Sequence, residues 1–160
     1  MSDMLVKLYE LPLLPTQKIE ALKNEGITFR QSIPPEKDIV IKWVKDTFGP
    51  GWANETEVAF HRQPVSCFIA LKEQEILGFA CYEATARNFF GPTGVKEDCR
   101  GKGLGMILLL LSLHALKNMG YAYAIIGGVG PVNFYQKAVG ATVIPDSSPG
   151  IYEGLLKNRG

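Results

Sequence analysis

The segment from Arg100 to Gly105 carries the residue types that most directly indicate chemistry, with glycine at positions 101, 103 and 105. It lies between an apolar extended segment ending at Val95 and a long apolar segment typical of a helix. Glycines let several backbone N–H groups point at one ligand, and a helix N-terminus adds the positive end of its dipole. Together these features predict a loop that binds an anion, most often a phosphate.

Two well-known phosphate loops have spacings that this segment does not match. A P-loop needs Gly, four residues and then Gly-Lys-Ser/Thr, and the sequence contains no such stretch. The dinucleotide pattern G-x-G-x-x-G would need its third glycine at Met106 or Leu108. The pattern that is present is Arg-x-x-Gly-x-Gly, from Arg100 through Gly103 to Gly105.

This pattern resembles the pyrophosphate-binding loop of the GCN5-related N-acetyltransferases (GNAT), which bind acetyl-CoA. The resemblance implies acetyl-CoA as co-substrate, with no metal. The loop residues that it implies in binding are Arg100, Gly101, Lys102, Gly103, Leu104 and Gly105.

A second stretch, which reads F-Y-Q-K from Phe134 and is followed by Gly140, resembles the family's F-Y-x-K helix that ends at a glycine. By this resemblance Tyr135 is the general acid that protonates the departing CoA thiolate, a task that suits an uncharged phenol. A tyrosine packed beside Phe134 is the structural alternative. The family often has an asparagine seven residues before this tyrosine, but Gly128 stands there. We therefore assign the cofactor contact to Asn133.

The strand before the glycine loop is expected to open the sheet. The resemblance implies that Thr93 and Val95 offer backbone groups to the pantetheine arm. Pro92 cannot donate to a ladder, and Gly91 and Gly94 favour a bulge, so this strand should separate from its parallel neighbour. An ordinary edge strand would also tolerate the proline.

The base that deprotonates an amine has no clear signature in this sequence. Glu83 is the candidate, because strand alternation puts it on one face with Phe79 and Cys81, where apolar surroundings would raise its pKa. A strand-end carboxylate in solvent, with water relaying the proton, is the alternative. Residues expected near the acceptor are His61, Glu55, Glu57, Trp52, Phe48, Phe90 and Tyr82.

Composition points to an ordinary globular protein of 160 residues, which we interpret as a single acyltransferase domain over 1–160, with an extension at 1–26 and a GNAT-like core at 27–160. The net charge of +1 gives no reason to expect nucleic acid or a membrane as partner. The three cysteines have no metal-site spacing and suggest reduced thiols in the cytoplasm. The extension is expected to add an edge strand and helix, or to contact a second subunit in a homodimer.

Periodicity and turn signals predict the order of elements. The strands are expected at residues 4–11, 27–33, 65–71, 75–84, 89–95, 121–126, 141–144 and 151–155, and the helices at 15–24, 36–48, 54–62, 103–118 and 132–138. From residue 27 this order resembles that of the GNAT family. The implied fold is α/β (α+β), with a mixed sheet of about six to seven strands, a splayed parallel pair and about four helices, plus the N-terminal strand and helix.

The resulting hypothesis is an N-acetyltransferase that moves an acetyl group from acetyl-CoA to a primary amine by direct attack in a ternary complex. A non-catalytic acyl-CoA-binding sensor or assembly module is the main alternative, and a purely structural domain is another. A covalent acyl-cysteine route through Cys99 lacks an evident histidine partner. The sequence does not distinguish a small-molecule from a peptide amine as acceptor.

Overall fold

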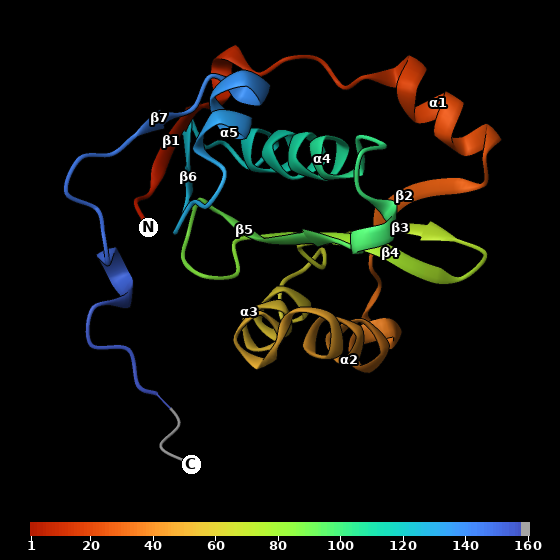
Figure 1. Cartoon of the computed structure of the whole chain (residues 1–160), viewed down its shortest axis with the longest axis horizontal. Coiled ribbons are helices and arrows are strands. Elements are labelled where there is room, and N and C mark those ends of the chain that lie inside the picture. The colour runs from red at the N-terminus through yellow and green to blue at the C-terminus, as the bar shows by residue number, and fades with distance from the viewer. Residues whose placement is uncertain (158–160) are drawn as a thin grey trace.

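The computed structural model describes residues 1–157, which form a seven-stranded mixed sheet with helices on both faces (Figure 1). The strands are β1 (Met4–Lys7), β2 (Ile27–Gln31), β3 (Cys67–Lys72), β4 (Glu75–Tyr82), β5 (Phe89–Val95), β6 (Tyr123–Ile126) and β7 (Thr142–Val143). The helices are α1 (Thr16–Asn24), α2 (Lys37–Phe48), α3 (Pro50–Phe60), α4 (Leu104–Asn118) and α5 (Val132–Val139). The strand order is β2-β3-β4-β5-β6-β1-β7. The predicted mixed sheet, with four helices and an additional strand and helix at the N-terminal side, is confirmed.

Two apolar cores lie on opposite faces of the sheet. The first joins α4 and α5 to β1 and β6, and the second lies between the sheet and helices α2 and α3, which cover the opposite face (Figure 1). Helix α4 is apolar nearly all round, and most of its side chains are buried from Leu104 to Leu116. Within residues 1–157 no helix is both long and apolar enough to cross a bilayer.

The parallel pair β5–β6 is short and then opens. Pairing joins Phe89 to Ile125 and Phe90 to Ile126, while β5 continues to Val95 without a partner on that side. All other strand pairs are antiparallel. The register between β4 and β5 shifts after Ala80, opposite the Gly91-Pro92 step. The predicted bulge and separation of this strand are therefore confirmed.

Two predictions at the ends of the chain are wrong. The N-terminal strand is not an edge strand, because β1 pairs with β6 on one side and with β7 on the other. Residues 151–155 form no strand; a 3-10 helix covers Gly150–Tyr152 instead. The sheet therefore ends at β7 on this side.

Candidate active site

The glycine loop presents unused backbone donors at the start of α4. Gly101 and Gly103 have left-handed backbones, with φ of 87° and 83°, and Gly103 is the N-terminal cap of the helix. Among residues 1–157, no hydrogen bond uses the N–H groups of residues 101–106. The N–H groups of residues 104–106 would be free at the start of any helix. The N–H groups of residues 101–103 add three more free donors before the helix begins. This arrangement can accept an anion with several phosphate oxygens.

The backbone of β5 directs polar groups into the gap beside β6. The Lys96 N–H donates to the Leu77 carbonyl of β4 at 2.8 Å. Because hydrogen-bonding direction alternates along an antiparallel strand, the polar groups of Val95 and Thr93 point the other way. The Val95 carbonyl accepts a hydrogen bond from Arg100 Nε at 3.3 Å, which leaves the N–H groups of Thr93 and Val95 for a ligand.

Tyr135 lies where the two parallel strands separate. Its ring contacts Phe90, the last paired residue of β5, with centroids 6.5 Å apart, and Phe134 at 5.1 Å. Burial raises the pKa of Tyr135 to about 12. Within residues 1–157 its hydroxyl makes no hydrogen bond. The phenol is therefore protonated and has its donor free.

The helix that carries Tyr135 also carries Asn133, which is exposed in the first turn of α5. Gly128 stands seven residues before Tyr135, where the family often has an asparagine. It has φ of 57° and donates its N–H to Asp3 Oδ1 at 2.8 Å. Asp3 thus fixes the loop before α5, a role for which the sequence offers no signal.

The comparison that decides the family is with family sequence models. The model described as Acetyltransferase (GNAT) family matches residues 37–141, about two thirds of the chain. The chain belongs to the GNAT family. The match spans the glycine loop and the Tyr135 helix and begins after the N-terminal extension.

Solved structures agree with the GNAT fold. A glucosamine N-acetyltransferase region of a fungal multi-domain GH3 β-N-acetylglucosaminidase has a TM-score of 0.70 at 15% identity, over 89% of this chain and 19% of that one. A GCN5-related N-acetyltransferase from Sphaerobacter thermophilus has a TM-score of 0.63 at 19% identity, over 89% of this chain and 48% of that one. Another, from Kribbella flavida, has a TM-score of 0.57 at 15% identity, over 89% of this chain and 53% of that one. This chain thus spans about half, or less, of these proteins. No curated protein matches.

Glu83 in this GNAT chain is buried, so the solvent-exposed alternative is wrong. It follows the end of β4 with φ of 59°, and its Oε1 accepts the Asn88 N–H at 2.7 Å. The carboxylate therefore closes the turn between β4 and β5. Its role as base stays a prediction.

The aromatic residues expected near the acceptor divide between the two faces of the GNAT sheet. Phe48 and Trp52 lie together under β5, with centroids 5.2 Å apart, and both contact Phe79. Tyr82 and Phe90 belong instead to the core on the α4 face. The sequence indicated the residue types but not this separation.

Polar residues expected at the acceptor side also differ in their surroundings. Glu55 Oε1 accepts hydrogen bonds from the hydroxyls of Thr85 at 2.7 Å and Tyr152 at 3.1 Å. Glu57 lies 3.7 Å from Lys37 Nζ, and His61 is exposed at the end of α3. Of these three, Glu55 alone contacts the turn between β4 and β5.

Cys99 borders the loop, but its surroundings disfavour a thiolate. Burial and the neighbouring Asp98 raise its pKa. His114 bonds the Pro12 carbonyl through Nε2 at 2.8 Å, fifteen positions further along the chain. The covalent route therefore has neither an activated nucleophile nor a paired histidine among residues 1–157.

Proposed function

We propose that this chain transfers an acetyl group from acetyl-CoA to a primary amine by direct attack in a ternary complex. The observation that carries the proposal is the set of unused N–H groups at residues 101–106, at the end of a strand that has left its neighbour. Membership of the GNAT family, whose members use acyl-CoA donors, supports it. Acetyl-CoA supplies an activated acyl group and a thiolate leaving group.

The loop and β5 hold and align the donor in this proposal. The N–H groups of residues 101–106 hold the diphosphate, with Arg100 and Lys102 adding charge. The N–H groups of Thr93 and Val95 bind the pantetheine arm as an added strand would. Donors of this kind near the thioester oxygen stabilise the oxyanion that develops as the amine attacks. Holding both reactants in one place supplies a further part of the rate.

Tyr135 acts on the leaving group. A phenol with a pKa of about 12 stays neutral throughout the physiological range, so its proton is present at every turnover. Thiols ionise near pH ~8.5, which makes full proton transfer from this phenol to the thiolate uphill. Tyr135 therefore stabilises the departing sulfur by a strong hydrogen bond, and the proton that the amine releases completes the exchange. Glu83, or water bound near it, takes that proton first.

The second candidate is a non-catalytic acyl-CoA-binding module. Two observations favour it: the Gly128 N–H is bound to Asp3, and one oxygen of Glu83 is occupied by Asn88. The free hydroxyl of Tyr135 favours the enzyme. We also propose that residues 1–160 act as one domain in the cytoplasm. We further propose a homodimer, which light scattering would test by measuring the molar mass in solution.

The test is release of free thiol from acetyl-CoA in the presence of a panel of small-molecule and peptide amines. Thiol release with at least one amine, lost in Tyr135→Phe while CoA binding persists, supports the enzyme and the hydrogen bond from Tyr135 to the departing sulfur. Tyr9→Phe, an exposed tyrosine on the other side of β6, is the matched control. Full activity of Tyr135→Phe would reject the role of Tyr135 at the leaving group. CoA binding without turnover on any amine would select the binding module.

A further inference from the structure

Helix α1, which lies outside the segment that matches the family, reaches the glycine loop through Lys18. The ammonium end of Lys18 lies against Gly103, so closely that a Cβ on Gly103 would overlap it. Leu22 of the same helix is buried in the core, and α1 packs against β2. The backbone that carries Lys18 is therefore held in position.

The charge of Lys18 has no partner within residues 1–157, where none of the ion pairs includes it. Near the loop, the exposed carboxylates of Glu97 and Asp98 offset Arg100 and Lys102. Lys18 thus gives this end of α4 its net positive charge. An unpaired cation on a loop of free amides suits a ligand of high negative charge.

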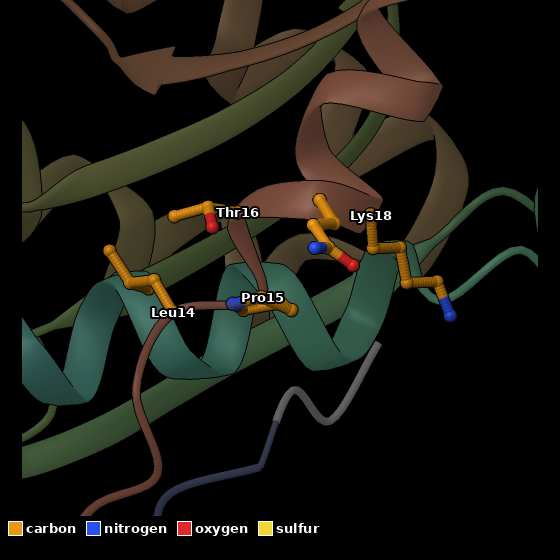
Figure 2. A pocket seen from close by; sticks show the side chains of 5 residues that line it. Leu14, Pro15, Thr16 and Lys18 are labelled. Carbon is orange, nitrogen blue, oxygen red and sulfur yellow. The ribbon is translucent and has the colours of Figure 1, made fainter.

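A hollow of about 420 Å³ adjoins Lys18 at the start of α1 (Figure 2). Its lining residues are Leu14, Pro15, Thr16, Gln17 and Lys18. Leu14 packs against the α4 core, and the Pro12 carbonyl is bound to His114 of α4. The hollow is wide open to solvent and is lined by five consecutive residues, of which Leu14 and Pro15 are apolar and Thr16, Gln17 and Lys18 are polar.

The hollow and the strand gap lie on opposite sides of the glycine loop. In Figure 1, β6 and the gap lie toward one end of α4, and α1 lies beyond the other end. A ligand whose diphosphate sits on the loop, and whose pantetheine arm enters the gap, must direct its nucleotide away from β6. That direction leads to the start of α1.

We propose that α1 completes the donor site: Lys18 contacts the diphosphate, and the hollow at residues 14–18 receives the adenosine end of coenzyme A. This inference rests on the proposed function, since it extends the same ligand beyond the loop. It gives residues 14–18 a binding role.

The test uses calorimetry with CoA and with its nucleotide part, 3′-phosphoadenosine 5′-diphosphate. Lys18→Met keeps the aliphatic stem and removes the charge. It is expected to weaken CoA binding about tenfold, because one partly exposed charge-assisted contact is lost. Lys23→Met, an exposed lysine on the same helix, is the matched control and is expected to bind as the unmodified chain does. Thr16→Trp fills the hollow and is expected to weaken CoA binding by a similar factor. Ala21→Trp is the control for it and is expected to leave CoA binding unchanged.

The outcomes separate this inference from the proposed function. If the unmodified chain does not bind CoA, the proposed function fails and this inference with it. If it binds CoA and Lys18→Met binds equally well, the role of Lys18 is overturned while the function stands. If the nucleotide part does not compete with CoA, or Thr16→Trp has no effect, the adenosine site is overturned.

Discussion

Replacing Gly94 by alanine tests how the aromatic cluster under β5 is packed. A Cβ at this position would overlap the ring of Phe48, whose centroid is 5.2 Å from that of Trp52 and 5.6 Å from that of Phe79. The backbone of Gly94 is outside the left-handed region, so the effect is purely steric. The methyl group must displace the ring and weaken aromatic contacts worth about 0.5–1.5 kcal/mol each. Overpacking of this kind costs about 1–3 kcal/mol. We expect the free energy of unfolding to fall by about 2 kcal/mol.

The assay is urea unfolding followed by tryptophan fluorescence, because Trp43 and Trp52 both lie in the cluster. If the clash is with Phe48, the costs of Gly94→Ala and Phe48→Leu should not add. Gly94→Ala should then lower the free energy of unfolding by less than about 0.5 kcal/mol when Phe48→Leu is already present. Gly51→Ala is the matched control. An added Cβ would have nothing within 4 Å, and Gly51 is exposed in the first turn of α3, so the substitution should change the free energy of unfolding by less than about 0.5 kcal/mol. An equal cost of Gly94→Ala in both backgrounds would refute the reasoning.

Three further predictions concern the site and its supports. Burial raises the pKa of Tyr135 to about 12, so its contribution to stability is full below pH 10 and is lost as pH rises through 12. The free energy of unfolding should therefore fall between pH 9 and pH 12, and Tyr135→Phe should make that fall smaller by roughly 2–3 kcal/mol, as measured by urea unfolding at both pH values. Gly103→Ala should lose about 1–2 kcal/mol to its left-handed backbone and meet Lys18 as well, so Lys18→Ala should restore only part of the melting temperature. Asp3→Ala should cost about 1 kcal/mol and speed hydrogen exchange at the Gly128 amide; unchanged exchange would contradict the 2.8 Å bond.

Local signals were enough to predict the elements that form the site. The bounds of β5 are as predicted, and α4 begins one residue later than predicted, because the glycine loop separates an apolar strand from an apolar helix. The free amides of the loop could also be predicted, since they follow from glycine at 101 and 103 before a helix. Their use for CoA stays a prediction until binding is measured.

Contacts between distant segments could not be predicted from local sequence. Nothing near Met4 indicates that its strand enters the sheet between β6 and β7, because pairing depends on segments more than a hundred residues away. The contact of Lys18 with Gly103 likewise depends on how α1 packs. The segment at residues 151–155 has residues suited to a strand, but the sheet ends at β7 and a 3-10 helix forms at Gly150–Tyr152 instead.

The position of β1 has a consequence for the order in which the molecule assembles. During synthesis on the ribosome β1 emerges long before β6 and β7, the two strands that complete its hydrogen bonds. Until those strands are made, Met4 and Val6, both fully buried in the finished protein, have no apolar surface of β6 to cover. β1 is thus made long before it is secured in the sheet, and a nascent chain halted before β6 would leave Met4 and Val6 without either neighbouring strand.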